Sequence, residues 1–170
     1  MKGQTIIFVM LSLFFTSCDN RENALAEKEQ TIKTNIKTLV EDCWNKKDLT
    51  SLHSIATEDV IRKVNGLTVS TSRNELEAGM TIYFIGFPDL VLTNPNIYIK
   101  DNLAFIDFTF SGSNTGVFAG TPATGKKVKV SGFSILHFND EGKMYLEDVH
   151  YNELDLLQQL GYTFNPPILE

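Results

Sequence analysis

The sequence has few residues of the kinds that bind metal ions or form disulfide bonds. It contains two cysteines, Cys18 and Cys43, and three histidines in 170 residues. Their scattered positions match no zinc-ligand spacing. The sequence also lacks a glycine-rich phosphate-binding motif and a serine-nucleophile motif. We therefore expect no metal centre, no nucleotide site and no serine hydrolase.

The apolar run near the N-terminus is too short to cross a membrane. Residues 6–15 are almost continuously apolar, whereas a spanning helix needs roughly 20 such residues. Lys2 precedes the run and the small residues Thr16 and Ser17 follow it. A positive charge, an apolar segment and a small-residue cleavage site form the pattern of a secretory signal peptide. We predict a signal peptide at residues 1–17.

The segment Phe15-Thr16-Ser17-Cys18 resembles the lipobox of bacterial lipoproteins, with Phe where Leu is usual. In that family the cysteine becomes linked to a diacylglycerol and is acylated after cleavage, and several acyl chains give firm membrane attachment. The resemblance implies a lipid anchor at Cys18 and a location in the cell envelope, on a periplasmic or outer-membrane face. Two alternatives stay open: ordinary secretion, and an uncleaved N-terminal anchor helix.

The composition indicates one acidic domain with an apolar interior. Removal of residues 1–17 takes away Lys2 and no acid, leaving 14 basic against 21 acidic residues. This net negative charge argues against binding to nucleic acid, whose phosphate backbone is also negative. The 12 phenylalanines suggest an apolar core, and one that can line a pocket. With Cys18 lipidated, Cys43 has no disulfide partner and we expect it to be buried.

Periodicity divides the chain into helices followed by strands. Apolar residues spaced three and four apart predict a helix over about 25–45. A short helix follows from Asp48, and a third spans about 73–84. Strands are expected at 90–100, 103–115, 126–138 and 143–151, and a last helix at 153–160 ends at Gly161. We assign 18–29 as a tether, 30–165 as the domain and 166–170 as a tail, with an α+β fold.

Three segments carry a family resemblance over about residues 30–165. They are Phe87-Pro88-Asp89-Leu90, the loop from Asn114 to Lys126, and Gly142-Lys143 followed by Leu156-Leu-Gln-Gln-Leu-Gly161. Together they resemble the SnoaL-like polyketide cyclases, also called ester cyclases. The resemblance implies a cone-shaped curved antiparallel sheet wrapped around N-terminal helices, as in the nuclear-transport-factor-like (cystatin-like) superfamily.

The resemblance also implies a chemistry, namely aldol-type ring closure without a metal or organic cofactor. An acid on the last strand serves as acid and base there. Many members carry His where this chain has Asn114, Trp where it has Asp148, and Asp where it has Asn152. An amide cannot act as a general base near neutral pH, but it can donate a hydrogen bond to an oxyanion.

Strict alternation along 143–151 would place Asp148, His150 and Asn152 on one face, together with Met144 and Leu146. If that face lines a pocket, Asp148 and His150 are the candidate catalytic residues. Asn114 and Asn152 are candidates for binding the substrate oxygen. Two aromatic residues, Trp44 and Phe133, complete the candidate substrate-binding set.

Two classes of function fit these features. The first is an enzyme that isomerises or cyclises a small carbonyl compound by acid–base chemistry. The second is non-catalytic binding of an apolar small molecule in the envelope. A dimerising interaction module that uses the sheet is a third possibility. The expected partners are therefore an apolar ligand, the membrane through the lipid anchor, and a second copy of the chain, with no nucleic acid.

Overall fold

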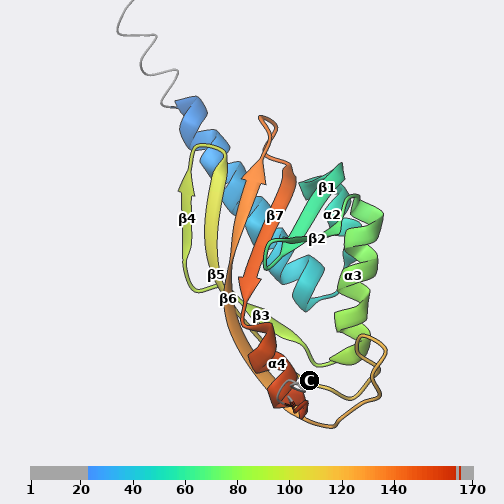
Figure 1. Cartoon of the computed structure of the whole chain (residues 1–170). Coiled ribbons are helices and arrows are strands. Elements are labelled where there is room, and N and C mark those ends of the chain that lie inside the picture. The colour runs from blue at the N-terminus through green and yellow to red at the C-terminus, as the bar shows by residue number, and fades with distance from the viewer. Residues whose placement is uncertain (1–22, 164, 166–170) are drawn as a thin grey trace, which may run out of the picture.

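A computed structural model describes residues 23–163 and 165 of the chain. A long helix at residues 23–38 continues directly into a π-helix, η1 (Leu39–Asn45). A 3₁₀ turn, η2 (Leu49–Ser51), and the short helix α2 (Leu52–Ile55) follow. Two further helices are α3 (Arg73–Gly86), which lies along one side of the sheet, and α4 (Glu153–Leu160), which lies at its lower end in Figure 1.

One curved sheet of seven strands forms the other layer. Its order is β2-β1-β7-β6-β5-β3, and β4 also pairs with β5. All pairs are antiparallel except β1 with β7, which run parallel. The strands are β1 (Ala56–Val64), β2 (Leu67–Ser70), β3 (Val91–Thr93), β4 (Ile97–Lys100), β5 (Leu103–Ser113), β6 (Lys127–Phe138) and β7 (Met144–Tyr151).

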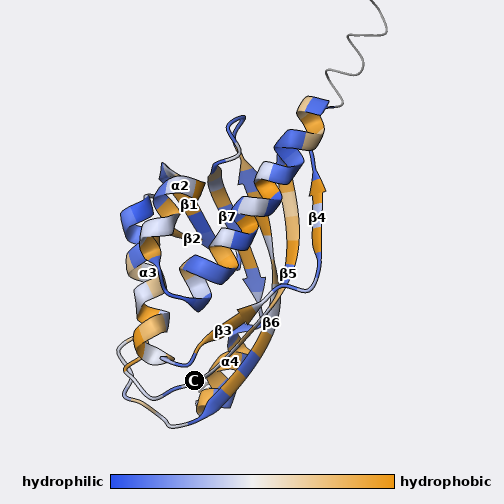
Figure 2. Ribbon diagram, turned by 180° about the vertical axis from the view of Figure 1, so that it is seen from behind, coloured by the Kyte–Doolittle hydropathy of each residue, from blue (hydrophilic) through white to orange (hydrophobic). Residues whose placement is uncertain are grey.

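The core lies between the concave face of the sheet and the N-terminal helix. Ile32, Ile36, Leu39 and Cys43 repeat at helical spacing and are all buried. Figure 2, seen from the side of this helix, shows it lying across the sheet with hydrophobic and hydrophilic positions interspersed. The α+β fold with a curved sheet around N-terminal helices is therefore confirmed. Among the described residues, no helix has the length and apolarity that a membrane span requires.

The helix ends follow local capping rules. The side chain of Ser72 accepts a hydrogen bond from the Glu75 N–H at the start of α3. Asn152 caps α4 in the same way, and Gly161 ends that helix at φ 99°. Glycine is favoured at a position with positive φ because it has no Cβ atom to clash with the backbone. The predicted bounds of α4 agree with the structure, and those of α3 differ by two residues at its end.

The strands deviate from the prediction where neighbouring segments determine the structure. The short helix from Asp48 was expected to end at residues 57–59, but these residues belong to β1, whose later residues pair with β7 and β2. The hairpin partner β2 was not predicted. The single strand expected over residues 90–100 is two, β3 and β4, with Pro95 between them. Proline has no N–H to donate and so interrupts a ladder.

Candidate functional site

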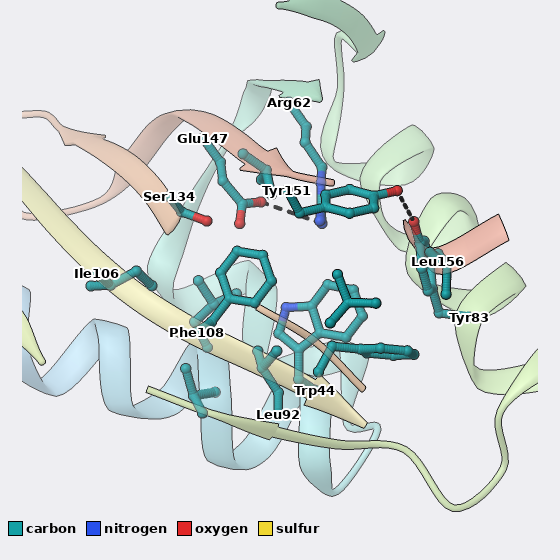
Figure 3. A pocket seen from close by; sticks show the side chains of 15 residues that line it. Trp44, Arg62, Tyr83, Leu92, Ile106, Phe108, Ser134, Glu147, Tyr151 and Leu156 are labelled. Atoms are coloured by element: carbon teal, nitrogen blue, oxygen red, sulfur yellow. Dashed lines mark hydrogen bonds and ion pairs between the residues drawn. The ribbon is translucent and has the colours of Figure 1, made fainter. Parts of the chain in front are cut away.

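A cavity of about 60 Å³ lies inside the cone, between the N-terminal helix and the concave face of the sheet (Figure 3). Its walls are largely apolar, and they come from η1, α3, α4 and the strands β1, β3, β5, β6 and β7. The apolar lining includes Leu39, Trp44, Leu92, Ile106, Phe108 and Leu156. An apolar cavity with a few polar groups that converge on it is the usual form of a small-molecule site.

The main polar feature of the cavity is a buried ion pair between Arg62 and Glu147. An Nη1 atom of Arg62 lies 3.4 Å from Oε2 of Glu147. The two residues are direct partners across the parallel β1–β7 ladder, so both side chains project from one face of the sheet. Glu147 is 4% exposed. The hydroxyl-bearing Ser134 lines the same cavity from β6.

The Arg62 guanidinium also packs against the indole ring of Trp44. The guanidinium carbon lies 5.3 Å from the centre of the indole ring, a cation–π contact. Trp44 belongs to η1, and short π-helical turns are frequent at functional sites. The structure therefore places Trp44 in the cavity wall. Its role in binding stays a prediction.

A pair of tyrosines closes one end of the cavity. The hydroxyl groups of Tyr83 on α3 and Tyr151 on β7 are 3.3 Å apart and hydrogen-bonded (Figure 3). Burial, and then the neighbouring Tyr83, raise the pKa of the Tyr151 phenol well above its usual value. Tyr151 is therefore a neutral hydroxyl at physiological pH, and it can donate a hydrogen bond to a ligand oxygen.

The expected placement of Asp148 and His150 in the pocket is wrong. The inward face of β7 carries Glu147, Val149 and Tyr151 instead. The physical reason is a β-bulge: Met144 pairs with Phe138, whereas Leu146 pairs with His137. β7 thus advances two residues while β6 advances one, and every later side chain changes face.

Asp148 and His150 form their own pair on the opposite face of the sheet. Nε2 of His150 lies 3.2 Å from Oδ1 of Asp148. The His150 ring stacks on Phe133, with ring centres 5.0 Å apart. Phe133 is likewise on this outer face and not in the cavity, where it was expected as a substrate-binding residue. The same alternation explains both errors, because Phe133 pairs with His150 across β6 and β7.

Asn114 and Asn152 do not line the cavity either, and both have structural roles. Nδ2 of Asn114 donates to the carbonyls of Gly86 and Gly116, and its Oδ1 accepts from the backbone and hydroxyl of Thr124. These bonds use the amide fully. Asn152 is exposed and accepts a hydrogen bond from the Asp155 N–H as the cap of α4. Asn114 therefore has no free donor for a substrate oxygen, and Asn152 lies at the exposed start of α4, outside the cavity lining.

The cysteine predictions differ in outcome. Cys43 is fully buried, as expected. Burial, assisted by nearby acidic residues of which Asp42 contributes most, raises the pKa of its thiol to about 12. The thiol is thus protonated and inert at neutral pH. Cys18, the predicted lipidation site, lies outside the described residues. In the part of the chain that is described, no three His, Cys, Asp or Glu side chains gather as a metal site would require.

The catalytic candidates missed by sequence reasoning are Arg62 and Glu147. Arg62 was missed because only a short strand at residues 60–61 was expected there, whereas β1 extends from Ala56 to Val64. Glu147 was missed because the bulge reversed the face. A signal was present in the alternation of Glu147 with Val149 and Tyr151, which puts one acid in an apolar row. Strand alternation alone does not say which row faces inward.

The comparison with protein-family profiles identifies one family. The sequence profile of the SnoaL-like polyketide cyclases matches residues 34–160. No curated protein matches the chain.

Several solved structures share the fold. A candidate SnoaL-like polyketide cyclase from Jannaschia sp. CCS1 is 17% identical with a TM-score of 0.71, covering 81% of this chain and 94% of its own. AclR, a candidate hydroxylase from Streptomyces galilaeus, is 26% identical with a TM-score of 0.67, covering 81% and 97%. A phenazine biosynthesis-related protein from Pseudomonas aeruginosa is 16% identical with a TM-score of 0.68, covering 85% and 88%. These names span different chemistries, so the residues of the site must decide the reaction.

Proposed function

The chain belongs to the SnoaL-like polyketide cyclase family, and on this premise we propose that its cavity binds the carbonyl group of an apolar compound and moves a proton on the neighbouring carbon. Glu147 is the acid–base residue of this proposal. Arg62 and Tyr151 hydrogen-bond the carbonyl oxygen. The result is isomerisation or ring closure of the bound compound.

The observation that supports this proposal is the position of Glu147. It is an almost fully buried carboxylate in a cavity whose other walls are mainly apolar, and it faces a guanidinium at 3.4 Å. Burying charged groups is unfavourable unless they are paired. In this fold both charged groups lie beside an open space that apolar side chains could have filled. Such an arrangement is typical of a site that binds or reacts with polar groups.

The reaction follows from the order of these groups. The carboxylate of Glu147 takes a proton from the carbon next to the carbonyl, so the C–H bond breaks and an O–H bond forms on Glu147. The electron pair moves to the carbonyl oxygen, where the Arg62 guanidinium and the Tyr151 hydroxyl stabilise the enolate. Return of the proton to another carbon isomerises the compound. Attack of the enolate carbon on a second carbonyl of the same compound forms a C–C bond and closes a ring, and the resulting alkoxide takes the proton back from Glu147.

The second candidate function is binding without turnover. The specific observation in its favour is that Arg62 already has two partners, Glu147 and the ring of Trp44. A charge pair that satisfies itself can orient a polar ligand group without reacting with it. The apolar walls would then supply most of the affinity.

Exchange of hydrogen for deuterium next to a ketone separates these candidates. Residues 19–170 are incubated with 2-butanone in D₂O, and loss of the α-proton signals is followed by NMR. The proposal expects exchange well above the buffer rate, and a loss of at least about 100-fold in Glu147→Gln, the range of general acid–base catalysis. Asp148→Asn is the matched control, because it makes the same chemical change one residue away on the outer face.

Each outcome decides between the candidates. Exchange that is absent, or equal in wild type and in a folded Glu147→Gln variant, overturns the catalytic proposal. Changes in the chemical shifts of the ketone protons when protein is added would then support binding without turnover. Circular dichroism on both variants keeps a failure to fold from being read as a loss of catalysis.

We further propose that the domain works in the cell envelope, held by a lipid on Cys18. The features that support this are the apolar run at residues 6–15, Lys2 before it, and the lipobox-like residues up to Cys18. The predicted tether at 18–29 would join the lipid to the domain. The substrate would accordingly be a compound that is present on that side of the membrane.

A further inference from the structure

A second cavity, of about 340 Å³, lies next to the first. Its walls come from α3, α4, β1, β2 and the loop that carries Phe118 and Ala119. Ligand pockets typically measure ~300–1,000 Å³. The inner cavity, at about 60 Å³, holds only a small fragment of such a ligand, whereas this outer cavity has the size of a binding site.

The two cavities share a boundary. Arg62, Tyr83, Tyr151 and Leu156 line both of them. The hydrogen bond between the hydroxyls of Tyr83 and Tyr151 therefore lies where the inner space meets the outer one. A neutral hydrogen bond of this kind contributes little net free energy, so a ligand that passes between the two rings can replace it.

The outer cavity is built for an apolar group. The larger part of its lining is apolar, from Val64, Val69, Leu76, Ile82, Phe118 and Leu157. Val69 and Ile82 are 56% and 46% exposed, respectively, so apolar surface continues outward from the cavity. Exposed apolar side chains next to a cavity are typical of a surface that binds an apolar group.

Ser70 adds one polar position. It lines the outer cavity and is 3% exposed, yet its hydroxyl has no hydrogen-bond partner among the residues that the structure describes. Buried polar groups are nearly always paired, so an unpaired hydroxyl beside an open cavity suggests that a bound molecule supplies the partner.

We propose that the outer cavity is the second compartment of one binding site, and that it holds the extended apolar part of a ligand whose carbonyl group lies beside Arg62 and Glu147. The inference rests on the proposed function and adds the substrate class to it. That class is ketones or related carbonyl compounds with an apolar substituent of several carbons. Very small carbonyl compounds would occupy only the inner cavity.

Gly79 offers a way to close the outer cavity alone. It lies on α3 with Leu76 and Ile82, three residues away on either side, and all three line the outer cavity but not the inner one. A Cβ atom built at Gly79 meets no atom within 4 Å. Gly79→Phe should therefore place its ring in or over the outer cavity without disturbing the helix. Ala78→Phe adds the same ring at the neighbouring exposed position, which does not line the cavity.

The experiment compares the affinities of 2-butanone, 2-heptanone and 2-nonanone by ligand-observed NMR titration. In wild type and in Ala78→Phe we expect affinity to rise up to about fourfold per added methylene, which corresponds to ~0.8 kcal/mol for each buried CH₂. In Gly79→Phe the rise with chain length should be lost, while 2-butanone binds as it does to wild type.

The outcomes distinguish this inference from the proposed function. The two-compartment site is overturned if affinity rises with chain length in Gly79→Phe as it does in wild type, or if it does not rise in wild type. Either result leaves the proposed function standing. A wild-type protein that binds none of the three ketones overturns both. Thermal unfolding of the two phenylalanine variants checks that each is folded.

Discussion

Arg62 and Glu147 are direct partners across the only described parallel strand pair of the sheet, and their charged groups meet at 3.4 Å inside the cone. The parallel pairing joins β1, from the first half of the chain, to β7, near its end. The two charges of the cavity are thus brought together by the longest-range pairing among the described strands. Several consequences of this arrangement can be measured.

The two charges should depend strongly on each other for stability. Arg62→Met leaves the Glu147 carboxylate buried without its partner, and we expect a loss of about 3–5 kcal/mol in the free energy of unfolding. The double variant with Glu147→Leu should recover most of that loss, because it removes both charges. Urea unfolding followed by circular dichroism measures this. Additive effects of the two substitutions would contradict the expected coupling.

Cys43 should make the protein sensitive to alkali. Burial raises its pKa to about 12, so between pH 9 and pH 12 the folded state keeps a proton that the unfolded chain releases. The free energy of unfolding should therefore fall in this range, by up to about 1.4 kcal/mol per pH unit. The full contribution of the thiol is present below pH 9. Cys43→Ala should remove this part of the slope, and an unchanged slope in that variant would refute the assignment.

Asn114 should hold the loop at residues 114–126 in place. Its amide forms four hydrogen bonds while 1% exposed. Asn114→Ala leaves backbone groups of the loop unpaired, and we expect about 1–3 kcal/mol less stability. Asn74→Ala, at an exposed position of α3, should change stability by no more than about 0.5 kcal/mol. Equal losses of stability in the two variants would argue against a role of Asn114 in fixing this loop.

The outer face of the sheet should mediate self-association. Four rings from four strands form a row there, Tyr98, Phe105, Phe133 and His150, with the two phenylalanine rings stacked at 5.1 Å. Such a row of exposed rings is suited to contact with the same row of a second copy. Phe133→Glu should shift the protein from dimer to monomer in analytical ultracentrifugation. Leu67→Glu, an equal change at an exposed apolar residue of β2, is the control. A wild-type monomer would refute this expectation.

The lipid anchor can be tested by mass spectrometry of the full chain expressed in a Gram-negative host. We expect a mature protein that begins at Cys18 and carries diacylglycerol and an acylated amine. Cys18→Ala should lack this added mass and no longer be anchored through it, whereas Cys43→Ala should keep the lipid. A mature wild-type chain without lipid would point to ordinary secretion instead.

The sequence by itself determined most of the elements. Their signals are local: apolar residues at helical spacing over 32–43, the side-chain cap at Ser72, and glycine at position 161 where the backbone needs a positive φ. Burial of Cys43 followed from the same helical face. The resemblance of residues 30–165 to the SnoaL-like family added the curved sheet around the helices, which the structure confirms.

Only the tertiary structure decided which residues face the cavity. One extra residue in β7, at Tyr145, reverses the faces of all that follow, so Glu147 lies inside and Asp148 outside. The bulge arises from pairing with β6, and the position of Arg62 arises from pairing of β1 with β7. These pairings join segments far apart in the chain. Local periodicity carries no information about them, and the site was therefore settled by strand register.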